Sequence, residues 1–89
     1  MFMDEKWFQE FKEKLDSYYT WPARYTFKFI VPSGKEDEVR ALFPMYLATA
    51  RESSRGRYTS LTFDMDMSSS DAVIAVYQKA AVVEGLIAL

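Results

Sequence analysis

Apolar residues recur at steps of three and four positions between Asp4 and about Tyr18, and mostly polar and charged residues fill the positions between them. This spacing gathers the apolar side chains on one face of an α-helix. Asp4 is suited to cap the first turn, and the Trp21-Pro22 pair ends the segment because a residue before proline is disfavoured in the α region. The pattern therefore predicts an amphipathic N-terminal helix, whose apolar positions are Trp7, Phe8, Phe11, Leu15 and Tyr18.

Two later segments, Tyr25 to Val31 and Arg57 to Met65, follow the two-residue period of a half-buried β-strand. A shorter strand-like run from Leu47 to Glu52 precedes the second of them. The turn between these two contains Gly56, a residue that tolerates the positive φ of a tight hairpin. Leu86 to Leu89 is long enough for one short terminal strand. Four strands are therefore predicted, and the core-facing residues of the hairpin's second strand are Thr59, Leu61, Phe63 and Met65.

Two further helices are indicated between the strands. Ser33 and Glu36 match a capping box at the start of the first one. Ser68 and Asp71 match the same pattern at the start of the other, and we expect Gly85 to stop that helix. The apolar stripes of these helices consist of Val39, Leu42 and Phe43, and of Val73, Val76, Tyr77, Ala80 and Ala81.

This order of elements predicts a ferredoxin-like α+β sandwich, βαββαβ, with an additional N-terminal helix. One antiparallel sheet would carry two helices on one face, with the first and third strands central and the short second and fourth strands at the edges. We expect a single domain over residues 1–89, made of an N-terminal amphipathic helix (1–20) and a ferredoxin-like core (21–89). The N-terminal helix would cover the open face of the sheet, wrap the edge of the sandwich, or dock on a second subunit.

Composition excludes several kinds of chemistry. The 89 residues include no cysteine and no histidine, which removes disulfides, thiolate zinc sites, imidazole acid–base catalysis and the usual nucleophilic triads. Asp64 and Asp66 alternate at a strand end, but they offer too few oxygen ligands for Mg²⁺ or Ca²⁺. We therefore expect no enzyme activity, no cofactor and no metal site.

Charge and hydropathy also limit the partners. A net charge of −2 and a sequence pI of about 5.0 argue against nucleic acid. The N-terminus runs directly into acidic residues, and no apolar run approaches the roughly 18 to 20 residues that span a membrane. The absence of cysteine suits a reducing compartment. We expect a cytoplasmic protein that binds neither nucleic acid nor membrane.

Positive charge is concentrated on the predicted hairpin of an otherwise slightly acidic chain. Arginine side chains, turn amides and hydroxyl groups together suit a carboxylate or a phosphate. The alternative is that these charges only protect an edge hairpin from pairing with other chains. The residues of this candidate anion- or partner-binding site are Arg51, Ser53, Ser54, Arg55, Arg57, Tyr58 and Lys28.

Three stretches carry a resemblance to a known family: Trp21-Pro22 ahead of Tyr25-Thr26-Phe27-Lys28, the run from Ser53 to Leu61, and Val76-Tyr77. Over about residues 21–89 the chain resembles the YbeD-like family of small bacterial proteins of unknown function. The resemblance implies a ferredoxin-like fold similar to ACT-type regulatory domains, which bind amino acids and control metabolic enzymes. Such domains commonly bind ligand near a glycine-containing loop after the first strand. The resemblance thus implies an effector loop at Ser33 and Gly34.

The sequence favours a non-enzymatic regulatory module that binds a small anionic metabolite. The alternative is a protein–protein interaction module, or a homodimer, that uses the N-terminal helix and the exposed sheet and binds no small ligand.

Overall fold

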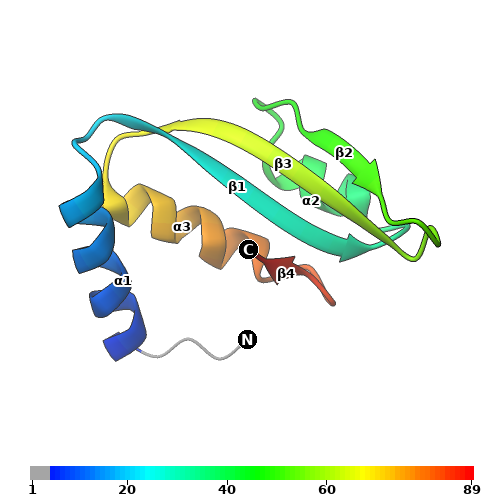
Figure 1. Cartoon of the computed structure of the whole chain (residues 1–89), viewed down its shortest axis with the longest axis horizontal. Coiled ribbons are helices and arrows are strands. Elements are labelled where there is room, and N and C mark those ends of the chain that lie inside the picture. Colours follow the sequence, from blue (N-terminus) through cyan, green and yellow to red (C-terminus); the bar gives the residue numbers. More distant parts are fainter. Residues whose placement is uncertain (1–4) are drawn as a thin grey trace.

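The computed structural model of the chain describes residues 5–89, which form three helices and one four-stranded sheet (Figure 1). The element order after the first helix agrees with the sequence prediction. The Asp4 cap lies outside the described residues. In chain order the elements are α1 (Glu5–Tyr18), β1 (Ala23–Pro32), α2 (Glu36–Leu42), β2 (Thr49–Glu52), β3 (Tyr58–Met67), α3 (Ser70–Ala80) and β4 (Ile87–Ala88).

The sheet has the strand order β2-β3-β1-β4, and every neighbouring pair is antiparallel. The two ten-residue strands β1 and β3 occupy the centre, as predicted, and pair along their whole length from Ala23 opposite Met67 to Pro32 opposite Tyr58. The four-residue β2 and the two-residue β4 are the edges. The fold is therefore α+β, with an antiparallel sheet that has two long and two short strands.

The core lies between the sheet and the helices. Alternate residues of β1 and β3 are buried, and Phe29 is fully shielded from solvent among four other aromatic rings. Burying side chains of this size stabilises a fold by roughly 1.5 to 3 kcal/mol each. The predicted inward face of β3 is confirmed. The fully buried strand residues are Phe27, Phe29, Val31, Leu61 and Phe63, with Thr59 and Met65 close behind.

Helix α1 lies beside α3, at the end of the molecule opposite the β2–β3 hairpin (Figure 1). Its Leu15 is buried, with 4% of its surface exposed, and the rings of Phe11 and Tyr77 are 5.7 Å apart between centroids. The open face of the sheet stays accessible, since Thr26 and Lys28 are exposed. Of the placements left open by the sequence, the helix takes the one at the edge of the sandwich.

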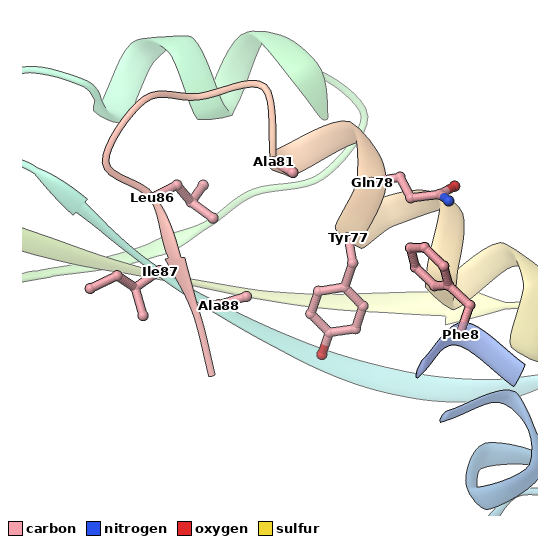
Figure 2. A pocket seen from close by; sticks show the side chains of 7 residues that line it. All are labelled: Phe8, Tyr77, Gln78, Ala81, Leu86, Ile87 and Ala88. Carbon is pink, nitrogen blue, oxygen red and sulfur yellow. The ribbon is translucent and has the colours of Figure 1, made fainter. Parts of the chain in front are cut away.

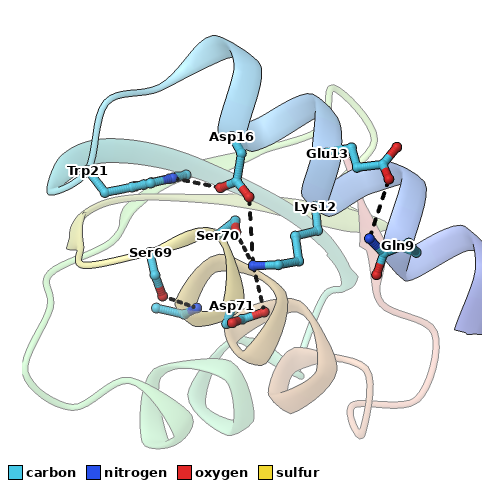
Figure 3. A network of polar contacts seen from close by, with 9 residues as sticks. Gln9, Lys12, Glu13, Asp16, Trp21, Ser69, Ser70 and Asp71 are labelled. Atoms are coloured by element: carbon cyan, nitrogen blue, oxygen red, sulfur yellow. Dashed lines mark hydrogen bonds and ion pairs between the residues drawn. The ribbon is translucent and has the colours of Figure 1, made fainter.

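A polar network fastens α1 to the start of α3 (Figure 3). The Lys12 ammonium donates to the Ser70 hydroxyl at 2.9 Å and lies 3.2 Å from the Asp71 carboxylate and 3.7 Å from the Asp16 carboxylate. The Trp21 indole N–H donates to Asp16 at 2.9 Å. Hydrogen bonds from Ser70 and Trp21, together with the charge of Lys12, hold the pKa of the Asp16 carboxyl below its usual value. The helix is thus held by polar contacts as well as by its apolar face.

Both predicted capping boxes are wrong in detail. The residue before α2 is Lys35, which makes no side-chain cap, because β1 continues to Pro32 and the Ser33 N–H donates to the Arg57 carbonyl at 2.9 Å. Helix α3 is capped by Ser69, whose hydroxyl accepts the Ala72 N–H at 3.1 Å. In both places the preceding strand is longer than predicted, so each helix starts later.

Within residues 5–89, no helix has both the length and the apolar character needed to cross a membrane.

Gly85 does not end α3, which stops at Ala80, and instead forms the turn into β4 with a φ of +81°. A Cβ at this position would lie 2.8 Å from the Pro32 Cγ. We expect Gly85→Ala to lower the free energy of unfolding by about 2 to 3 kcal/mol, because strain at positive φ adds to this clash. Urea denaturation followed by circular dichroism measures the loss.

Gly56 provides the matched control for that substitution. Its φ is +69°, but an added Cβ would meet no atom within 4 Å. Gly56→Ala should therefore cost only about 1 kcal/mol of backbone strain. Equal losses in the two variants would show that Pro32 gives way and contributes no clash.

Candidate functional site

The strand register brings part of the predicted basic cluster together on the open face of the sheet. Arg51 of β2 and Ile30 of β1 both lie opposite Ser60 of β3, and Lys28 lies one row away, opposite Thr62. A shallow hollow of about 310 Å³ lies over these rows, next to the hairpin. It is lined by Lys28, Ile30, Arg51, Glu52, Ser53, Tyr58 and Ser60.

The two cations of this hollow, Lys28 and Arg51, have no carboxylate partner among residues 5–89, as is also true of other exposed cations such as Arg55. Four basic residues elsewhere are in ion pairs, among them Lys12 with Asp71 at 3.2 Å. Glu52 contributes one negative charge at the rim. The hollow therefore has an excess of one positive charge and offers two cationic donors to an incoming anion.

The serine hydroxyls of the hollow shape the hairpin. The Ser53 hydroxyl accepts the Tyr58 N–H at 3.3 Å, and the Ser60 hydroxyl donates to the Arg51 carbonyl at 3.3 Å. The Gly56 N–H donates to the Ser53 carbonyl at 2.9 Å and closes the turn. These bonds fix the backbone on both sides of the hollow, so that Arg51 and Tyr58 extend from a defined strand pair.

Three of the predicted residues do not line this hollow. Ser54, Arg55 and Arg57 belong to the exposed turn at the tip of the hairpin and its first residue beyond. The Arg57 carbonyl accepts the Ser33 N–H and extends the β1–β3 ladder by one pair. The structure therefore joins Lys28, Arg51, Ser53 and Tyr58 into one surface and leaves the tip arginines outside it.

The predicted effector loop already contains an internal anion. The Gly34 N–H donates to one oxygen of the Glu36 carboxylate, and the Thr59 hydroxyl donates to the other at 3.0 Å. Hydrogen bonds from its own backbone N–H and from Gly34, with a smaller one from Thr59, hold the pKa of the Glu36 carboxyl below its usual value. A second hollow of about 330 Å³ beside this loop also contains Asp37 and Glu52. The loop donor is occupied and its surroundings are acidic, which disfavours anion binding at Ser33 and Gly34.

Sequence reasoning missed an apolar groove of about 410 Å³ between α1, α3 and β4. Figure 2 shows Phe8 approaching from α1, Tyr77 pointing from α3 toward the sheet, and Leu86 leading into β4. The Tyr77 hydroxyl is 3.0 Å from that of Tyr25, and burial raises the pKa of Tyr77 well above its usual value. The phenol therefore stays neutral at ordinary pH. No sequence signal could reveal this groove, because Phe8 of α1 is far in the chain from the residues of α3 and β4 that form the rest of its wall.

The acidic pair of β3 is used within the sheet. Asp64 accepts a hydrogen bond from the Thr26 hydroxyl, and Asp66 lies 3.7 Å from Arg24 on the neighbouring strand. Across residues 5–89 the structure contains no cluster of three or more acidic side chains placed to hold a metal ion.

One comparison with known proteins finds a match. The family described as "Protein of unknown function (DUF493)" matches residues 16–87, which include the hollow and all of the sheet except Ala88 of β4, but only the last turn of α1. Curated proteins and solved structures show no match to the chain.

Proposed function

Since the chain belongs to the DUF493 family, whose function is unknown, we propose from its own geometry that it is a non-enzymatic module that binds a small anion. The proposed site is the hollow on the open face of the sheet. The single observation that carries this proposal is that Lys28 and Arg51 line the same hollow. They are cations from different strands, and neither has a carboxylate partner among the described residues.

The other residues of the hollow restrict the ligand. Ile30 forms an apolar part of the floor, and the half-exposed ring of Tyr58 stands at the side. A carboxylate or phosphate would bind between Lys28 and Arg51, while an attached apolar group would contact Ile30 and Tyr58. Small metabolites that combine an acidic group with an apolar part meet both requirements.

The finer assignments of fold and role belong to the same proposal. A ferredoxin-like βαββαβ classification is supported by the element order after α1 and by the central position of β1 and β3. We propose with it a YbeD-like, ACT-like regulatory role in the cytoplasm, in which ligand binding changes the behaviour of an associated protein. The acidic surroundings of Glu36 favour the hairpin hollow over the loop after β1 as the proposed ligand site.

A thermal-shift screen against amino acids, nucleotides and phosphorylated metabolites tests this proposal, followed by calorimetry on any compound that binds. We expect Arg51→Ala and Lys28→Ala each to weaken binding about 10- to 100-fold, because a hydrogen bond to a charged group contributes about 1.5 to 3 kcal/mol. The melting temperature of the free protein should hardly change, since both side chains are exposed.

Arg55→Ala is the control, because this arginine has the same charge but lies at the hairpin tip outside the hollow. It should bind the compound about as well as the unchanged protein. The proposal fails if no compound shifts the melting temperature, or if Arg55→Ala loses as much affinity as Arg51→Ala.

A further inference from the structure

Strand β2 lies at one edge of the sheet. The backbone N–H and C=O groups on its outer side pair with no other strand of residues 5–89. The Ser53 N–H donates to the Tyr58 carbonyl at 2.8 Å, which sets the phase of the ladder between β2 and β3. Because residues of an antiparallel strand direct their N–H and C=O alternately to either side, Thr49 and Arg51 face β3. Ala50 and Glu52 therefore direct their backbone donors and acceptors outward.

This edge is short and carries Arg51 and Glu52, two features that can keep strand edges apart, but nothing in residues 5–89 covers it. All four residues of β2 are exposed, and none is proline. The segment that leads into the strand also exposes two large apolar side chains, Met45 at 90% and Leu47 at 97%. An open row of backbone donors and acceptors beside apolar side chains is a template for another strand.

We infer that a second copy of this chain pairs its β2 with this edge across a two-fold axis, which joins the two sheets into one of eight antiparallel strands. The edge is suited to its own copy because a two-fold axis places the same outward donors and acceptors on both strands. The antiparallel arrangement also keeps the basic hairpin tips apart, since each tip lies beyond the start of the other β2. This interface goes beyond the proposed anion site and does not depend on it.

Charge and strand overlap together select the register of this pairing. Four two-fold registers place side chains of the same sheet face opposite one another, and they centre on Thr49, Ala50, Arg51 or Glu52. The last two would place Arg51 or Glu52 directly opposite its own copy, and like charges in direct opposition are destabilising. The registers centred on Thr49 and Ala50 avoid this, and the one centred on Ala50 pairs three residues of each β2 with the other β2, whereas the one centred on Thr49 pairs only one.

In the register centred on Ala50, every charged residue of β2 meets an uncharged one. Arg51 lies opposite Thr49 of the second copy, and Glu52 lies opposite its Ala48. Leu47 lies opposite Ser53 of the second copy, which moves one of the most exposed apolar side chains from solvent to the interface. The pairing thus satisfies the free backbone groups of Ala50 and Glu52 at the same time as it covers apolar surface.

Single-cysteine variants read this register directly, because the chain contains no cysteine. In the inferred pairing the two Ala50 Cα atoms would be about 5.5 Å apart, within the span of a disulfide. Under mild oxidation we expect Ala50→Cys to form a covalent dimer about tenfold faster than Ser54→Cys, a collision control in the exposed turn, since pairing raises the local thiol concentration. Faster cross-linking of Thr49→Cys, which keeps both charges of β2, or equal rates for all variants, would overturn the inference.

The mass of the unmodified protein provides an independent test. Sedimentation equilibrium should show the average mass rising with concentration from the 10.4 kDa of one chain toward twice that value. Ala50→Pro should stay monomeric and folded, because it removes an N–H that points away from β3, while the control Ala50→Val should still associate. A measured mass of 10.4 kDa at every concentration would overturn the inference. If Ala50→Pro does not fold, the cross-linking rates of the single-cysteine variants still test the pairing.

Discussion

Replacing Phe29 by alanine is expected to lower the free energy of unfolding by about 3 to 5 kcal/mol, as is typical for a large aromatic side chain deleted from a core. Phe29 lies at the middle of the central strand β1 and has no exposed surface. Its ring centroid is 6.0 to 6.2 Å from those of four neighbours, so its removal leaves a cavity that no single side chain can fill. These neighbours are Phe27, Phe43, Phe63 and Tyr77.

Domains of this kind are stabilised by about 5 to 15 kcal/mol in total, so the loss would be a large part of it. Urea denaturation followed by circular dichroism gives the change as a shift of the midpoint. Tyr58→Ala is the control, because it removes an aromatic side chain from the neighbouring strand on the open face, where 46% of its surface is exposed. If the two variants lost similar stability, the packing of the core around Phe29 would be looser than the ring distances indicate.

Leu15→Ala should cost about 2 to 5 kcal/mol, the range for a buried leucine. Leu15 is the buried residue of α1 and lies in the helix's last full turn before the chain enters β1. The expected loss is large because α1 then belongs to the same cooperative unit as the sheet. The unfolding midpoint in urea, measured by circular dichroism, reports the difference.

Tyr18→Ala, on the same helix, is the matched control, since 86% of its surface is exposed. It should change the free energy of unfolding by less than about 0.5 kcal/mol. An unchanged midpoint for Leu15→Ala would mean that α1 is attached only by its polar contacts and could be removed without damage to the sheet.

Strand periodicity predicted the sheet well because burial on one face repeats every second residue. Phe27 and Phe63, read from separate segments, are in fact directly opposed across the two central strands. The helix starts were less predictable. A serine before an acidic residue marks a cap only where the preceding strand has ended, and β1 and β3 each continue one or two residues further than the alternation indicated.

The docking of α1 could not be derived, because an apolar stripe shows that a helix needs a surface but not which one. The contact between Phe11 and Tyr77 joins residues 66 positions apart, and no local pattern specifies it. The candidate site had the same difficulty. Lys28 and Arg51 meet through the pairing of β1 and β2 with β3, whereas Arg55 is much nearer to Arg51 in the chain and lies outside the hollow.

The position of α1 also determines what the protein's own fluorescence can report. The chain has two tryptophans, Trp7 within α1 and Trp21 just after it, where it stacks on Tyr19 at 5.3 Å and donates to Asp16. Helix α1 lies at the end of the molecule opposite the hairpin (Figure 1), and both tryptophans belong to this helix or to the segment that follows it. Their fluorescence reports how α1 packs, and it should not change when an anion or a second chain binds at the hairpin. Binding at that end is better followed by the NMR resonances of the backbone amides.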